Sequence, residues 1–140
     1  MRSLIVFSCF FLSFLPVAFA QENIFANEHY QFAAIGDYGS HSNGEKAVAK
    51  IIHQYEPSFI ITLGDNNYPN GCWKTIDKNI GQYYHDYIHP YVGDYGPGAK
   101  YNRFFPSLGN HDWNARKKCL KNGTLPYLLY FSLPNNQRYY

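Results

Sequence analysis

Three short segments of the sequence combine a glycine with side chains that bind metal ions. They are Gly36-Asp37-Tyr38-Gly39, Gly64-Asp65-Asn66-Asn67-Tyr68 and Gly109-Asn110-His111-Asp112. Carboxylate, amide and imidazole groups of this kind can hold a pair of divalent or trivalent cations. One carboxylate can bridge two cations, and Asp65 in the middle segment is the candidate for that position. Tyr68 adds a phenol that ionises at a pH of about 10 in water, so it indicates a strong Lewis acid such as Fe³⁺.

Each segment follows an apolar run that predicts a buried strand, at 31–35, 59–63 and 104–108. Between the first two runs, residues 45–55 carry apolar side chains at helical spacing, and Asn43 is the candidate N-cap. A strand, a helix and a strand in this order predict a βαβ unit with parallel strands. Ligands bind outside the carboxyl ends of parallel strands in open α/β sheets, so we expect the three segments to meet in one crevice.

The rest of the chain predicts a helix over 76–87, an ordered loop over 90–103 and a fourth strand over 128–133. Gly93-Asp94-Tyr95-Gly96 in that loop repeats the first segment letter for letter. A single Gly-Asp pair is common in turns, and no strand precedes this copy. We therefore interpret it as a turn in which Asp94 caps the backbone or faces solvent.

Residues 1–20 predict a secretory signal peptide, with Arg2, an apolar run over 4–17 and the cleavage signature Ala18-Phe19-Ala20. An uncleaved membrane anchor is the alternative. The mature chain, 21–140, contains no second apolar stretch of membrane length. We therefore expect a secreted or periplasmic protein without a membrane span.

Composition and cysteine content agree with a globular exported protein. Of the 140 residues, 46% are hydrophobic and 16% are charged, and the net charge is +2. This weak charge excludes a disordered acidic tail, and we expect no nucleic-acid binding. Cys72 and Cys119 remain after signal cleavage, and two cysteines in an oxidising compartment can form one disulfide.

The three segments, in this order and spacing, resemble the motifs of the calcineurin-like metallophosphoesterases. The variant of the second motif that contains Tyr68 is similar to the purple acid phosphatase branch. The resemblance implies an α/β fold, a four-layer β-sandwich of mixed sheets flanked by helices. It also implies hydrolysis of small phosphate esters by metal-activated hydroxide, with two metal ions, Fe³⁺ plus divalent Fe, Zn or Mn. By this resemblance Asp37 would bind the first metal ion, Asp65 would bridge both ions and Tyr68 would bind the ferric ion. Asn110 would bind the second metal ion. His111 would take part in catalysis or contact the substrate phosphate, and Asp112 would orient His111.

The chain departs from that family in its histidines. The family completes its site with an isolated His and a Gly-His-x-His motif, whereas His111 is the last of six histidines here. Residues 21–140 are therefore expected to be the N-terminal part of such a domain. The alternative is a non-catalytic fragment or a metal- or phosphate-binding remnant that lacks a complete second metal site. An aromatic-rich carbohydrate-binding module would explain the 19% aromatic residues but not the three segments.

Three other histidines are secondary candidates. His41 follows the first segment and is placed either at the substrate or in a surface loop. His85 and His89 are four residues apart, a spacing that can chelate a metal on a helix. Pro90 directly after His89 favours a helix end or the rim of a cleft instead. The sequence indicates neither the identity of the substrate nor the oligomeric state.

Overall fold

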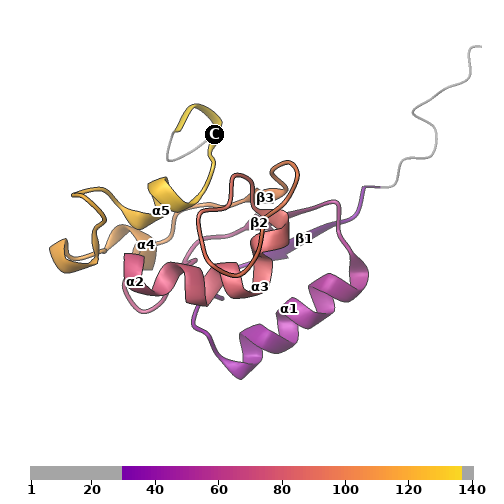
Figure 1. The fold of residues 1–140 in the computed structure, drawn as a ribbon. Helices are drawn as coiled ribbons and strands as arrows, with labels where there is room; N and C mark the ends of the chain where they lie inside the picture. The colour runs from indigo at the N-terminus through magenta and orange to yellow at the C-terminus, as the bar shows by residue number, and fades with distance from the viewer. Residues whose placement is uncertain (1–29, 137–140) are drawn as a thin grey trace, which may run out of the picture.

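The computed structural model describes residues 30–136, so the predicted signal peptide lies outside the described residues. Within them, three strands form one parallel sheet in the order β1-β2-β3 (Figure 1). The strands are β1 (Phe32–Ile35), β2 (Phe59–Thr62) and β3 (Phe104–Phe105). The predicted parallel βαβ unit is therefore confirmed. Strand β3 is shorter than predicted because Pro106 has no N–H to continue the ladder.

Helix α1 (Asn43–Tyr55) connects β1 and β2. Its N-cap is Ser42 and not the predicted Asn43, because the Ser42 hydroxyl accepts a hydrogen bond from the backbone N–H of Glu45 at 3.2 Å. The helix ends where Glu56 adopts a left-handed conformation with φ 47°.

A continuous helical segment covers residues 73–87 and confirms the helix predicted over 76–87, with a start three residues earlier. Its middle is a π-helical turn, in which the backbone hydrogen bonds are one residue longer than in an α-helix. The loop over 90–103 contains no helix or strand, as predicted. The parts of the helical segment are α2 (Trp73–Ile76), η1 (Asp77–Gly81), α3 (Gln82–Tyr84) and η2 (His85–Tyr87).

The prediction of a fourth strand over 128–133 is wrong. Helix α5 (Pro126–Tyr130) occupies its first half. Pro126 at the first helical position has a backbone conformation suited to starting a helix. Tyr127 and Tyr130 are both buried, and their spacing of three places them on one helix face. The remaining elements are α4 (Asn110–Trp113), η3 (Lys117–Cys119) and η4 (Pro134–Asn136).

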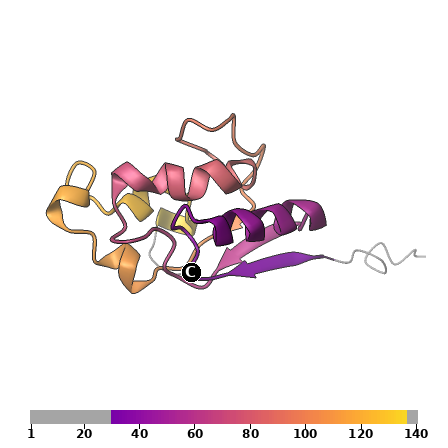
Figure 2. The ribbon, with the colours of Figure 1, turned by 90° about the horizontal axis from the view of Figure 1, so that it is seen from below.

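The two faces of the sheet differ in burial. Figure 2 shows α1 and the helical segment on one side of the sheet. Ile35, Ile60 and Phe104 are buried in one core cluster with residues of α1 and of the helical segment. The other side carries a ladder of rings that we call the phenylalanine face. It consists of Phe32, Phe59 and Phe105, with Phe32 stacked on Phe59 at 5.4 Å and Phe59 against Phe105 at 5.9 Å between ring centroids.

The phenylalanine face is partly open to solvent, since Phe32 is 55% exposed. The described residues therefore have a mixed α/β fold with one three-stranded parallel sheet. The second sheet that the predicted sandwich requires is not found among residues 30–136. Nor does any helix in that range have the length and apolar character needed to cross a membrane.

Candidate metal centre

The structure brings the three glycine-containing segments together at the carboxyl ends of the strands. The backbone N–H of Asp37 donates to Gly64 O at 3.3 Å, which joins the first two segments. A Cβ atom on Gly39 would lie 1.7 Å from Asn66 O, so only glycine permits this approach of the first loop to the second. A Cβ atom on Gly64 would lie 3.1 Å from the Cα of Gly109, which places the third segment against the second.

Three oxygen-containing side chains that could bind a metal ion come together in this cluster. The Tyr68 hydroxyl donates to Asp37 Oδ1 at 2.8 Å and lies 3.4 Å from Asp65 Oδ2. Asp37 and Asp65 have φ values of 50° and 53°, a left-handed conformation that non-glycine residues rarely adopt. Strained backbone of this kind is concentrated at functional sites.

The electrostatics of Tyr68 follow from the same contacts. Removal of water from around the phenol, its hydrogen bond to Asp37 and the negative charge of Asp65 all raise the pKa of Tyr68 above its usual value. A multivalent cation at this point would reverse the effect, because it replaces the shared proton and favours the phenolate. The donor set of two carboxylates and a phenol therefore fits a hard cation such as Fe³⁺.

His111 borders this group of oxygens. Its backbone N–H donates to Asp65 Oδ1 at 2.9 Å, and its ring lies 4.3 Å from the Tyr68 ring between centroids. The ring nitrogen Nδ1 is 2.6 Å from Pro69 O. Because a carbonyl oxygen only accepts hydrogen bonds, Nδ1 carries a proton, and Nε2 is the acceptor atom of the neutral ring.

Asp112 has a different position from the one that the resemblance implies. Its carboxylate accepts hydrogen bonds from the backbone N–H groups of Asn66, Asn67 and Gly109 at 3.0–3.1 Å, and from the side-chain amide of Asn66 at 2.8 Å. Burial raises the pKa of Asp112, although these hydrogen bonds lower it in part. Asp112 therefore fastens the second segment to the third, and it is Pro69, not Asp112, that contacts the ring nitrogen of His111.

Asn110 is exposed at the start of α4, directly after Gly109. A Cβ atom on Gly109 would lie 2.1 Å from Asp65 Oδ1, so the chain at this point approaches Asp65 closely. Residues 30–136 contain no group of three or more His, Cys, Asp or Glu side chains placed to hold a metal ion. The second metal position that the resemblance implies would use Asp65 and Asn110.

The secondary histidine candidates contact other groups. His41 is exposed, and its Nδ1 is 3.0 Å from the Tyr83 hydroxyl. The Nδ1 atoms of His85 and His89 face different carbonyl oxygens, Gly81 O for His85 and Ala99 O for His89, each at 2.9 Å.

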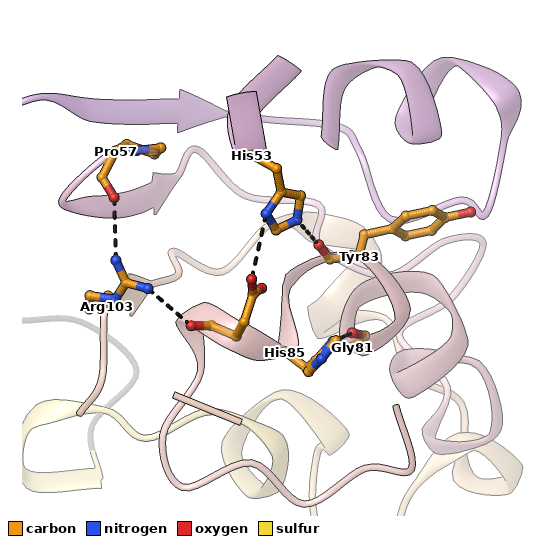
Figure 3. Close-up of polar contacts among 7 residues, drawn as sticks. His53, Pro57, Gly81, Tyr83, His85 and Arg103 are labelled. Atoms are coloured by element: carbon orange, nitrogen blue, oxygen red, sulfur yellow. Dashed lines mark hydrogen bonds and ion pairs between the residues drawn. The ribbon is translucent and has the colours of Figure 1, made fainter. Parts of the chain in front are cut away.

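Figure 3 shows the contacts that fix the helical segment onto α1. His53 Nε2 lies 2.7 Å from Tyr83 O, and its Nδ1 lies 3.5 Å from a carboxylate oxygen of Asp86. The Arg103 guanidinium donates to Pro57 O and Asp86 O and lies 4.4 Å from the centroid of the Tyr87 ring. The role of these residues is therefore to join elements.

The structure joins Cys72 and Cys119 in a disulfide, 47 residues apart in sequence. The bond ties the chain that follows α4 to the residue before α2. Gly71 next to it lies against the third segment, because a Cβ atom there would be 2.8 Å from Asp112 O. The disulfide is thus a neighbour of the candidate metal centre.

Asn79 is a buried residue of the π-helical turn that was not among the candidates predicted from the sequence, and its amide points at the first two segments. One signal was available in the sequence. Asn79 lies four residues before Tyr83 on the predicted apolar stripe of the helix, and an amide in such a position needs hydrogen-bond partners inside the protein.

Comparison with known proteins found no match to the chain among protein-family models, curated proteins or solved structures.

Proposed function

We propose that this chain provides the ferric side of a binuclear metal-dependent phosphoesterase that hydrolyses small phosphate esters. The observation that carries the proposal is the approach of the Tyr68 hydroxyl to both Asp37 and Asp65 at the carboxyl ends of parallel strands. This arrangement agrees with the resemblance drawn from the sequence. A secreted or periplasmic location follows only from the predicted signal peptide.

Each residue has a defined role in this proposal. Asp37 and Tyr68 would hold Fe³⁺, Asp65 would be shared between the two metal ions, and Asn110 would contribute to a second site for divalent Fe, Zn or Mn. When bound, the metal pair supplies hydroxide near neutral pH and neutralises charge on the phosphoryl group. The contact with Pro69 keeps the proton of neutral His111 on Nδ1, so Nε2 is the atom that can gain a proton and deliver it to the leaving oxygen.

The same proposal includes the finer fold, a four-layer sandwich of which the described residues form one sheet and its helices. The phenylalanine face supports it. A sheet normally buries its apolar face against another layer, and this face presents three packed rings with Phe32 more than half exposed.

A metal- or phosphate-binding module without catalysis is the second candidate. One observation favours it, the lack of a cluster of three His, Cys, Asp or Glu side chains in the part of the chain that the structure describes. Such a module would still bind one cation at Asp37, Asp65 and Tyr68, but it would not turn over a substrate.

The test is hydrolysis of p-nitrophenyl phosphate by the purified chain loaded with Fe³⁺ and Zn²⁺. Asp65→Asn should lower kcat by about 100-fold or more, as expected when charge stabilisation of a transition state is lost. Asp94→Asn is the matched control, because Asp94 lies in the exposed turn that repeats the first segment and should leave kcat unchanged.

A metal-binding assay separates the two candidates. The ferric protein should show a visible tyrosinate-to-iron absorption band that Tyr68→Phe removes. The band without hydrolysis would favour the non-catalytic module, whereas a wild-type chain that binds no metal would contradict both.

A further inference from the structure

The side-chain amide of Asn79 contacts both loops that carry the candidate metal ligands. Its amide nitrogen Nδ2 lies 2.9 Å from each of three acceptors, namely Gly39 O, Tyr68 O and Asn67 Oδ1. Only 5% of the residue is exposed. An amide carries two N–H groups, so the three oxygens share two donors. Asn79 thus joins the loop after β1 to the loop after β2.

The π-helical turn η1 places this amide, and it is anchored from its other side. Asp77 at the start of the turn accepts hydrogen bonds from the hydroxyls of Tyr91 and Tyr130, the latter at 2.7 Å. Its other oxygen accepts the backbone N–H of Asp94 at 2.9 Å. A π-helical turn is rare within α-helical structure and frequently occurs at functional sites. Here it keeps a helix residue directed at two loops.

The two backbone carbonyls that Asn79 contacts belong to a single structural unit. Gly39 O also accepts the backbone N–H of Tyr68 at 2.7 Å, and the Tyr68 hydroxyl reaches back to Asp37. The two loops are therefore joined by backbone hydrogen bonds, by the phenol and by Asn79. Without the N–H donors of Asn79, the buried carbonyl groups of Gly39 and Tyr68 would each lose a hydrogen bond, which is energetically costly.

We propose that Asn79 is a positioning residue that fixes the backbone of Gly39 and Tyr68 and thereby holds the phenol against Asp37 and Asp65. The inference about metal affinity rests on the proposed function, whereas the placement of Tyr68 does not. Groups that orient metal ligands typically change metal affinity by about 10- to 100-fold when they are removed.

The experiment compares Asn79→Ala with Asn102→Ala. Asn102 is a matched control, since its side chain also makes three hydrogen bonds, with Phe104 O, Ser132 O and the N–H of His89, none of which belongs to the candidate centre. Fe³⁺ affinity is measured by competition with a chelator. Asn79→Ala should weaken it by about 10- to 100-fold, and Asn102→Ala should leave it within about two-fold.

A double variant tests whether Asn79 acts through Tyr68. In a Tyr68→Phe background, Asn79→Ala should have little further effect on metal affinity, although its effect on thermal stability should persist. An equal loss of affinity with and without the phenol would overturn the proposal. So would equal affinities in the Asn79→Ala and Asn102→Ala variants.

The metal-free protein gives an independent readout. In a ¹³C-tyrosine-labelled sample, Asn79→Ala should shift the ring resonances of Tyr68, and Asn102→Ala should not. A wild type that binds no metal would contradict the proposed function alone. Unchanged Tyr68 resonances in Asn79→Ala would contradict the proposal that Asn79 positions the Tyr68 ring. If Asn79→Ala does not fold, Asn79→Ser replaces it, because serine retains a hydroxyl donor. The Tyr68 ring resonances should then shift in the same direction.

Discussion

Glu45 is a buried carboxyl group beneath the loop that follows Asp37. Its Oε2 accepts the backbone N–H groups of Ser40 and His41 at 3.0 and 2.6 Å, while its Oε1 is buried without a hydrogen-bond partner in the described structure. Removal from water raises the pKa of Glu45 from 4.5 to about 7, although the backbone hydrogen bonds act in the opposite direction. The titratable groups that interact with its charge are the hydroxyls of Tyr38, Tyr83 and Tyr84.

The raised pKa predicts that folding stability depends on pH through this residue. The folded protein favours the protonated form, so the contribution of Glu45 is complete below pH 4.5 and is lost as the pH rises through about 7. Glu45→Gln has the same shape and no charge. Relative to the wild type, its free energy of unfolding should therefore rise between pH 5 and pH 8 by up to about 3 kcal/mol.

Urea unfolding at the two pH values measures this difference. Glu56→Gln is the control, because Glu56 is exposed after the end of α1 and its replacement should have the same effect at both pH values. A Glu45→Gln effect that does not change with pH would show that the carboxyl group does not titrate in this range.

Residue spacing in the sequence was sufficient to predict that Asp37, Asp65 and Tyr68 lie together, because the ends of parallel strands meet at one edge of a sheet. It was not sufficient for Asp112 and Asn79. Their partners are mostly backbone groups of distant segments, and backbone groups carry no signature in the sequence. The side chains that build the loops are therefore harder to predict than those that project from them.

At the scale of elements, the candidate centre depends on how closely the loops after β1 and β2 approach each other. Gly39→Ala would place a Cβ atom 1.7 Å from Asn66 O, which is backbone and cannot move without the whole loop. We expect a loss of stability of at least about 1–3 kcal/mol, the usual cost of overpacking. Displacement of the loops should also weaken metal binding.

Gly44→Ala is the control for this prediction. Gly44 lies in the first turn of α1, and a Cβ atom there would lie 3.7 Å from the Ser42 hydroxyl, an ordinary contact. Alanine is a better helix former than glycine, so this variant should gain up to about 1 kcal/mol. Thermal unfolding of both variants decides the point, and similar midpoints would contradict the close approach of the loops.

Elements were predicted well where one periodicity was unambiguous and poorly where two were possible. The apolar positions Ala47, Val48, Ile51, Ile52 and Tyr55 have only a helical interpretation, and α1 confirms the helix. Of these side chains only Ile52 is buried, because the face turned to the sheet is that of Glu45, Ala49 and Ile52. The short apolar run over 128–133 suits either a strand or a helix, and Pro126 before it decided in favour of the helix. The π-helical turn has no distinct pattern in the sequence, so its presence could not be predicted.

At the scale of the whole molecule, the sheet is covered on one side and partly open on the other. Ile60 and Phe104 are 0% and 1% exposed beneath the helices, whereas Phe32 is 55% exposed on the phenylalanine face. The sequence predicted apolar strands but could not show which face of each is covered, because both faces of β2 carry apolar side chains. Such a face is typical of a sheet that packs against a second layer.

The openness of the phenylalanine face leads to the last prediction. The dye 8-anilinonaphthalene-1-sulfonate binds exposed apolar surface, so its fluorescence reports whether the face is accessible in solution. Phe32→Ser removes one of the three rings and should lower the fluorescence of the bound dye by roughly a third, in proportion to the rings lost. Tyr101→Ser is the control, because Tyr101 is 64% exposed but lies in the loop before β3. Equal dye binding by the two variants would show that the face is covered in solution, and no dye binding by the wild type would show the same.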